Sequence, residues 1–180
     1  VSPDLPGLKV IHNGNYVSLQ GATVANRTYK VTVNRAVIDE FGQTLGRDET
    51  VTWKVGSAQP NLFGPQGLVV VDPGAKRPTL DYFSVGHIGL KVKLYKVTPA
   101  DWDRFGAAMQ RQWDRKNPPT LPGTLVFDHN VRVAGKRDEL TETAIDLTPA
   151  LGKGGLGHVV AVVEPTPWKE AYDPPRFYSW

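Results

Sequence analysis

The sequence predicts an all-β protein made of antiparallel β-sandwich units in tandem, with one short α-helix inserted in the second unit. Apolar and polar residues alternate with a period of two in several short segments, which is typical of half-buried strands. The 180 residues include 18 glycines and 15 prolines, more than an average protein contains, so many turns separate these segments. A helical spacing of large apolar residues occurs in one segment and predicts the helix.

The first 58 residues contain four predicted strands, at 8–12, 15–19, 29–33 and 51–55. Asn13-Gly14 lies between the first two and favours a two-residue type I′ hairpin turn, in which both central residues have positive φ. Such a turn places Val10 opposite Val17 on the face that a sandwich would bury. It places Leu8 opposite Leu19 on the same face. Because a complete sandwich of this type has about seven strands, we expect this unit to be truncated.

Glycine and proline mark a linker after the first unit, at Gly56, Pro60, Gly64 and Pro65. We place the domain boundary between residues 58 and 59. We expect the whole stretch 56–67 to act as a hinge, because a central strand would not tolerate its prolines. Six further strands are predicted at 68–72, 79–85, 88–97, 125–133, 140–147 and 158–163. The last of these contains a run without polar residues, 159–163, and should lie centrally in its sheet.

A helix is predicted over residues 99–115. Thr98 can cap its N-terminus, Pro99 suits the first helical position, and Asp101 lies where a capping-box acid belongs. Large apolar side chains then recur at spacings of three, four and four residues on one face: Trp102, Phe105, Met109 and Trp113. We expect this stripe to cover the sheet of the second domain, as a crossover between 88–97 and 125–133.

Composition and charge exclude several classes of function. The net charge is only +3 and lysine and arginine are scattered, whereas a nucleic-acid-binding surface gathers them, so no nucleic-acid partner is expected. The absence of cysteine excludes disulfides and thiolate chemistry. No apolar run approaches the roughly 18 residues of a transmembrane helix. Since no leader segment precedes the first strand, we expect the chain to be a piece of a longer protein.

The motifs of catalysis and cofactor binding are not supported. Residues 152–157 match the G-x-G-x-x-G pattern, but they lead into a predicted strand rather than a helix, so we interpret them as a turn and expect no cofactor. His12, His87, His129 and His158 lack metal-ligand spacing, and only a meeting of His87 with His129 in the fold would suggest a metal. None of the serines lies in a nucleophile elbow. No catalytic or metal-binding residue is therefore assigned, and the chain is not expected to be an enzyme.

The C-terminal segment concentrates aromatic residues among prolines: Trp168, Tyr172, Phe177, Tyr178 and Trp180. The interleaved prolines prevent a regular helix. These side chains either pack onto a neighbouring domain or form an exposed stacking platform for a sugar or peptide. We favour the first alternative and treat the five as candidate domain-contact residues.

Several segments resemble a known family. Residues 27–33 (RTYKVTV), 37–45 (VIDEFGQTL) and 51–55 (VTWKV) look like the closing part of a bacterial Ig-like domain. Residues 78–80 (PTL), 90–102 (LKVKLYKVTPADW), 146–151 (DLTPAL) and 157–165 (GHVVAVVEP) look like a macroglobulin-type domain. This order is similar to the N-terminal region of bacterial alpha-2-macroglobulins. The resemblance implies an Ig-like part at 1–58 and a macroglobulin-like domain at 59–180.

The resemblance also implies a function for the parent protein. Bacterial alpha-2-macroglobulins are large periplasmic or cell-surface protease inhibitors, often lipid-anchored, that offer a bait segment and enclose the protease that cuts it. Many of them also hold a Cys–Gln thioester, which a chain without cysteine cannot form. We therefore expect a non-catalytic scaffold segment whose partners are neighbouring domains and, for the full-length protein, proteases. The alternative is an Ig-like binding or adhesion module of a bacterial surface protein.

Overall fold

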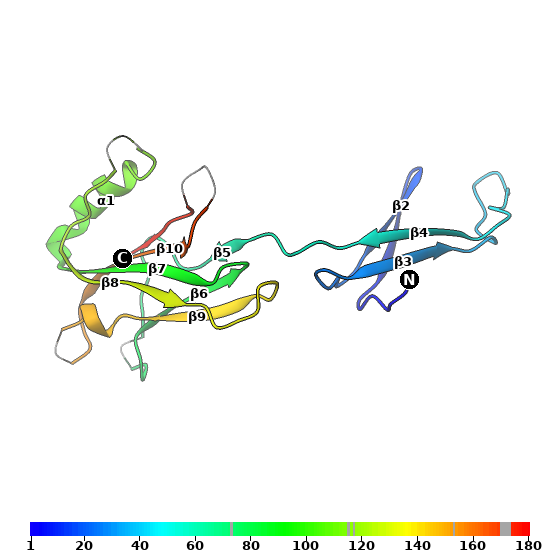
Figure 1. Ribbon diagram of the computed structural model, residues 1–180. Coiled ribbons are helices and arrows are strands. Elements are labelled where there is room, and N and C mark those ends of the chain that lie inside the picture. Colours follow the sequence, from blue (N-terminus) through cyan, green and yellow to red (C-terminus); the bar gives the residue numbers. More distant parts are fainter. Residues whose placement is uncertain (73, 115, 117, 153, 170–173) are drawn as a thin grey trace. The chain divides into compact units, whose positions relative to one another are not determined.

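The computed structural model describes residues 1–72, 74–114, 116, 118–152, 154–169 and 174–180 (Figure 1). Contacts along the chain divide it into two compact units, Val1–Ala58 and Gln59–Trp180. Both consist of antiparallel strands, and the second carries the short helix, so the predicted all-β fold class is confirmed. The assignment of the first unit to an Ig-like domain and of the second to a macroglobulin-like domain stays a prediction.

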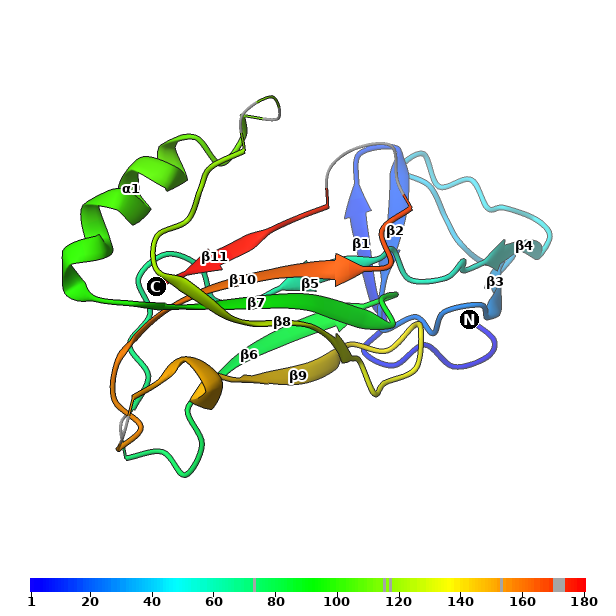
Figure 2. The ribbon, with the colours of Figure 1, turned by 60° about the vertical axis from the view of Figure 1, so that its left-hand side comes forward.

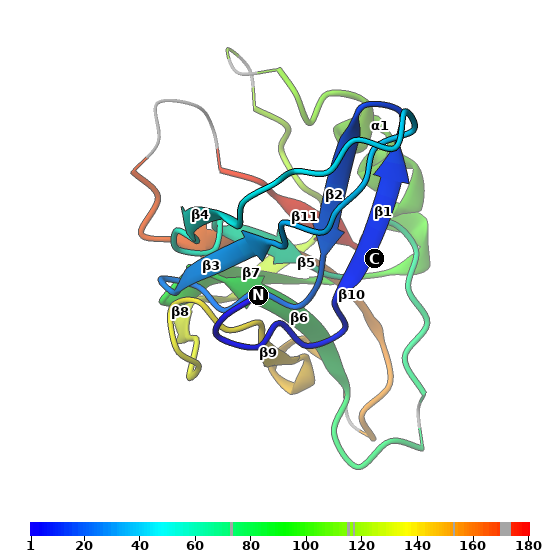
Figure 3. The same cartoon turned by 90° about the vertical axis from the view of Figure 1, so that its right-hand side faces the viewer.

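The first unit is made of two hairpins. β1 (Lys9–Asn13) pairs with β2 (Tyr16–Gln20), and β3 (Thr28–Val33) pairs with β4 (Glu49–Lys54). The two hairpins run at a steep angle to each other (Figure 3). Leu5 and Tyr29 are the buried large side chains of this unit. The Tyr29 hydroxyl oxygen accepts a hydrogen bond from the backbone N–H of Val24 at 3.0 Å. These contacts form the small core of this unit.

The register of the first hairpin differs from the prediction. Asn13 pairs with Tyr16, so the two central turn residues are Gly14 and Asn15, and Val10 faces Leu19 instead of Val17. Gly14 has φ +57° and Asn15 does not have positive φ, which is the type II′ pattern with glycine at the first central position. The slip moves each partner by two positions, so Val10, Val17 and Leu19 still share one face.

The predicted burial of that hairpin face is wrong. Val10 is 65% exposed and Val17 is 59% exposed. On the other hairpin Val51 is 64% exposed. A sandwich covers such faces by packing one sheet on another, whereas two two-stranded sheets offer too little area to do so.

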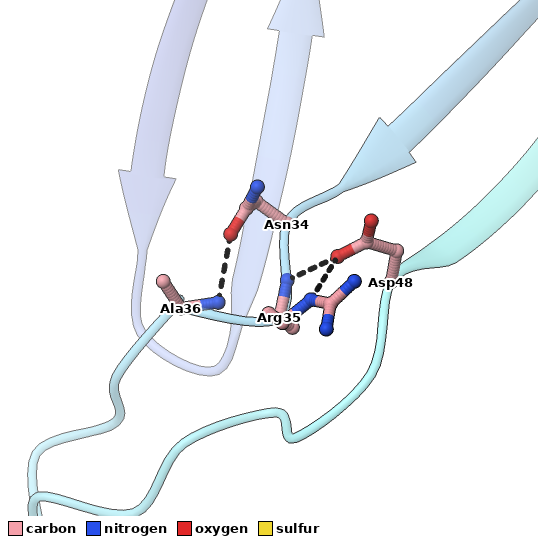
Figure 4. A network of polar contacts seen from close by, with 4 residues as sticks. All are labelled: Asn34, Arg35, Ala36 and Asp48. Carbon is pink, nitrogen blue, oxygen red and sulfur yellow. Dashed lines mark hydrogen bonds and ion pairs between the residues drawn. The ribbon is translucent and has the colours of Figure 1, made fainter.

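A polar network closes the long connection between β3 and β4 (Figure 4). Asp48 Oδ1 accepts a hydrogen bond from the backbone N–H of Arg35 at 2.8 Å and lies 3.4 Å from its Nε. Asn34 Oδ1 accepts from the N–H of Ala36 at 2.8 Å. The two side chains satisfy backbone donors just beyond the ends of the strands, which holds the base of the loop.

The second unit is a sandwich of two antiparallel sheets (Figure 2). One sheet has the order β11-β10-β7-β8 and the other the order β5-β6-β9. The strands are β5 (Asn61–Phe63), β6 (Thr79–Val85), β7 (Gly89–Val97), β8 (Thr124–Arg132), β9 (Thr141–Asp146), β10 (His158–Thr166) and β11 (Phe177–Ser179). The 3₁₀ turns η1 (Pro99–Asp101) and η2 (Thr148–Ala150) precede α1 and follow β9.

The core lies between the two sheets and follows the two-residue period of the strands. Leu80 and Tyr82 of β6 and Leu90, Val92 and Leu94 of β7 are at most 5% exposed. In β10, Val159, Ala161 and Val163 face this core, while Val160 and Val162 face a second cluster beneath the helix. Because both faces are covered, β10 carries the run without polar residues, and its predicted central position is confirmed.

Two predicted segments are corrected by the structure. Residues 61–63 form β5 at the edge of a sheet, so the stretch 56–67 is not a hinge along its whole length. Residues 68–72 are not a regular strand; the Val69 N–H donates to the carbonyl of Trp180 at 2.9 Å and the Gly67 N–H to that of Tyr178 at 2.8 Å. Pro65 does not interrupt β5, because the strand ends at Phe63, two residues before the proline. β5 lies at the edge of its sheet, so one of its sides forms no ladder hydrogen bonds.

The helix begins as predicted and ends earlier. The Asp101 carboxylate accepts hydrogen bonds from the backbone N–H of Thr98 at 3.0 Å and from its hydroxyl at 2.9 Å, and these bonds lower the Asp101 pKa. α1 (Trp102–Gln110) follows η1 and ends at Gln110 instead of 115. Beyond it the Arg111 N–H bonds the carbonyl of Ala108, three residues back, which tightens the last turn; residue 115 lies outside the described residues.

Candidate functional site

A cluster of aromatic rings joins the helix to the sheet in the second unit. The Trp180 ring lies 5.3 Å from that of Trp102 in an edge-to-face arrangement, 5.5 Å from that of Phe105 and 6.0 Å from that of His158. Trp180 is 8% exposed and Phe105 is 3% exposed. Such pairs add to the free energy of burial, so this cluster anchors α1 on the outer face of β10 and β11.

The apolar stripe of the helix is only partly buried. Phe105 and Ala108 are buried and Met109 packs against the cluster that contains Phe105, but Trp102 is 43% exposed and Trp113 is 83% exposed. The expectation that the whole stripe covers the sheet is therefore wrong. Trp102 is the first residue of α1, and Trp113 follows its last turn, where the helical spacing no longer places it on the same face.

The two aromatic residues of β11 pack on its opposite faces. Phe177 contacts Tyr82 edge-to-face at 5.9 Å, and Tyr178 is buried against the helix cluster. Ser179 Oγ donates a hydrogen bond to the Pro65 carbonyl at 2.9 Å. Tyr178 and Trp180 are thus core residues of their own unit and Phe177 packs against its core, while the contact of these three with a neighbouring domain stays a prediction.

Tyr82 is a central core residue that the sequence analysis did not single out. Its side chain has no exposed surface, and its hydroxyl donates a hydrogen bond to the Pro65 carbonyl at 3.2 Å. Burial raises the pKa of this phenol. The alternation of residues 79–85 places Tyr82 on the inward face with Leu80, and this pattern predicts from the sequence that Tyr82 is buried.

Trp168 lies after β10, and Tyr172 lies outside the described residues. The Trp168 ring contacts that of His87, with ring centres 6.1 Å apart and the planes inclined by 40°. Burial lowers the His87 pKa. The pair lines a groove of about 480 Å³ to which Arg132, Arg137 and Lys169 also contribute.

Ion pairs lie on the outer face of the larger sheet. Lys91 Nζ pairs with Asp128 across β7 and β8, and this hydrogen bond lowers the pKa of Asp128. Arg176 Nε lies 2.7 Å from Glu164 Oε2, which raises the Arg176 pKa. The outer face of β7 therefore takes part in a salt-bridged surface, and exposed pairs of this kind contribute little to stability.

His87, His129 and His158 contact aromatic rings, and the glycine-rich loop leads into a strand. His87 contacts Trp168 and His129 contacts Phe127 at 4.8 Å, and no group of three or more metal-ligating side chains occurs among the described residues. Gly152 N–H bonds the Leu156 carbonyl at 3.0 Å, and β10 follows, so the prediction of a turn leading into a strand is confirmed. No described helix is long and apolar enough to cross a membrane.

Together, the antiparallel sheets in two consecutive units and the sandwich core of the second define a multidomain β-sandwich protein. The chain has the fold of bacterial alpha-2-macroglobulin domains. It superposes on a Salmonella alpha-2-macroglobulin mutant with a TM-score of 0.61 at 14% identity, over 96% of this chain and 10% of that chain. It superposes on the native conformation of E. coli alpha-2-macroglobulin with a TM-score of 0.54 at 15% identity, over 97% and 11% respectively.

A third similar structure is an E. coli alpha-2-macroglobulin fragment spanning domains MG0-NIE-MG1. The TM-score is 0.49 at 17% identity, over 94% of this chain and 55% of that chain. The resemblance inferred from the sequence is confirmed at the level of the fold, and the chain spans about a tenth of the two long alpha-2-macroglobulin chains. No protein-family model and no curated protein sequence matches the chain.

Proposed function

We propose that the chain is a non-catalytic scaffold segment of a bacterial alpha-2-macroglobulin-like protein, whose full-length form is a broad-range endopeptidase inhibitor that traps proteases. One observation carries the proposal. The fold similarity to the Salmonella alpha-2-macroglobulin mutant covers 96% of this chain, so it includes both units, and 10% of that much longer chain. The segment would hold neighbouring domains of the same protein in place. A periplasmic or cell-surface location belongs to the same proposal.

The chemistry of the chain supports a scaffold role. Its buried groups are engaged in packing, as Tyr82 and Trp180 illustrate, and its perturbed carboxyl groups have structural partners. A thioester needs a cysteine, and the sequence has none. Covalent capture of a protease would therefore depend on another part of the parent protein.

The proposal is tested with trypsin and elastase. The chain alone, added at one equivalent, should leave hydrolysis of a large protein substrate unchanged, because a scaffold segment of this size would not enclose a protease. The full-length protein should suppress hydrolysis of the large substrate while a small peptide substrate is still cut. Loss of activity with the chain alone, or equal inhibition of both substrates by the full-length protein, would contradict the proposal.

A further inference from the structure

The groove beside Trp168 is built where three strands of one sheet meet at the same end. In β7, Gly89 pairs with Arg132 of β8 on one side and with Thr166 of β10 on the other. The arrowheads of β8 and β10 lie together at this end, away from α1 (Figure 2). His87 precedes β7, Trp168 and Lys169 follow β10, and Arg137 lies in the loop after β8. Residues far apart in sequence are thus gathered around one groove.

Backbone contacts fix the walls of this groove. The Val133 N–H donates to the Ile88 carbonyl at 3.0 Å, and the Gly86 N–H donates to the Arg137 carbonyl at 2.8 Å. These bonds tie the segment after β8 to the turn before β7. Gly135 is packed so closely that an added Cβ would lie 1.6 Å from Thr141 Oγ1. The cationic side chains therefore extend from an anchored backbone, as a preformed site requires.

The groove combines positive charge with an aromatic wall. Arg132, Arg137 and Lys169 line it, and none of the described lining residues carries a carboxylate. Within the described part of the chain, the ion pairs do not involve Arg132, Arg137 or Lys169, so the side chains of these three residues are available to a ligand. The Trp168 and His87 rings, whose planes are inclined by 40°, form an aromatic wall of the groove, and burial lowers the His87 pKa, which favours the neutral imidazole.

We propose that this groove binds an acidic saccharide, with one sugar ring stacked on the Trp168–His87 wall and its acid group accepting hydrogen bonds from Arg132 and Arg137. Guanidinium groups match carboxylate and phosphate oxygens in a bidentate geometry. The volume of about 480 Å³ suits a small ligand. A single-stranded nucleic acid needs a basic track with successive stacking side chains, whereas the described lining of this groove contains the Trp168 and His87 rings alone.

The binding test uses defined probes and the intact chain. Tetragalacturonate provides carboxylates, glucose 6-phosphate provides a phosphate, and maltotetraose is the neutral counterpart; binding is followed by calorimetry and by tryptophan fluorescence. At least one acidic sugar should bind ten times more tightly than maltotetraose. The response of the two acidic probes distinguishes a carboxylate from a phosphate ligand. Binding of neither, or equal binding of maltotetraose, overturns the proposal.

Variants separate the two parts of the site. The double variant Arg132→Gln/Arg137→Gln should weaken binding of the acidic sugar at least tenfold, and Trp168→Ala should weaken it about fivefold and remove most of the fluorescence change. Lys136→Gln is the matched control, because Lys136 lies in the same loop but pairs with Glu139 at 3.0 Å. Equal losses in the control overturn the proposal. So does binding of inorganic phosphate or an oligonucleotide as tight as that of the acidic sugar.

Discussion

The attachment of α1 to the sheet can be tested by removing its aromatic side chains one at a time. Phe105, Trp102 and Trp113 all belong to the apolar stripe that the sequence places on one helical face. In the structure they are 3%, 43% and 83% exposed. We therefore expect three different losses of stability from Phe105→Ala, Trp102→Ala and Trp113→Ala.

The magnitudes follow from burial. Replacing Phe105 loses its transfer free energy and leaves a cavity beneath the Trp180 ring, at a cost of about 3–5 kcal/mol. Trp102 already leaves nearly half of its surface in water, and its open site forms no closed cavity, so its replacement costs about 1–2 kcal/mol. In a unit of this size 1 kcal/mol corresponds to about 3–5 °C in Tm. The expected decreases in Tm are about 9–25 °C for Phe105→Ala and about 3–10 °C for Trp102→Ala.

Thermal melts followed by near-ultraviolet circular dichroism and by calorimetry provide the measurement. Calorimetry separates the transition of the second unit from that of the first. Trp113→Ala is the control and should shift Tm by no more than about 2 °C, as expected for an exposed side chain. The packing argument is refuted if Trp113→Ala is as destabilising as Phe105→Ala, or if Phe105→Ala leaves the transition unchanged.

Two further predictions concern buried hydroxyls and a surface carboxylate. The Ser84 and Thr143 side-chain oxygens are buried without a hydrogen-bond partner among the described residues. Ser84→Ala and Thr143→Val should therefore leave the free energy of unfolding unchanged or raise it by up to about 1 kcal/mol, with Tm unchanged or higher. A clear decrease in Tm contradicts this. The hydrogen bond from Lys91 lowers the Asp128 pKa in the folded state, so its stabilising effect is complete above the unfolded value of about 3.9 and is lost as pH falls through the folded-state pKa. Asp128→Asn should lower Tm at pH 7 and reduce the fall in Tm between pH 5 and pH 2.5; an unchanged fall shows that the pair is not responsible.

Short-range sequence patterns predicted the strands well where apolar side chains alternate with a period of two residues. The alternation of residues 79–85 and 88–97 fixed both β6 and β7, because apolar side chains on every second position can be buried only as a strand. The capping residues Thr98 and Asp101 likewise fixed the start of the helix, since the bonds involved join residues three positions apart.

Prediction from short-range sequence patterns failed where the same residues are compatible with two conformations. Asn13-Gly14 and Gly14-Asn15 are both acceptable hairpin turns, and only pairing along the whole of β1 and β2 selected the second. Residues 68–72 have the composition of a strand, yet they lie beside the short β11 and form only part of a ladder. The helix stripe continued to Trp113 in the sequence although the helix itself ends at Gln110.

The sequence by itself determined the all-β class, the positions of most strands, the start of the helix and the absence of cysteine chemistry, because each depends on residue type or short-range spacing. Only the tertiary structure decided which aromatic residues are buried and which are exposed. Trp180 is a core residue because β11 pairs with β10 and Trp180 packs in the same cluster as Phe105 of α1. Trp168 and His87 met because the ends of β10 and β7 lie side by side in the sheet, a relation between distant residues that no local pattern contains.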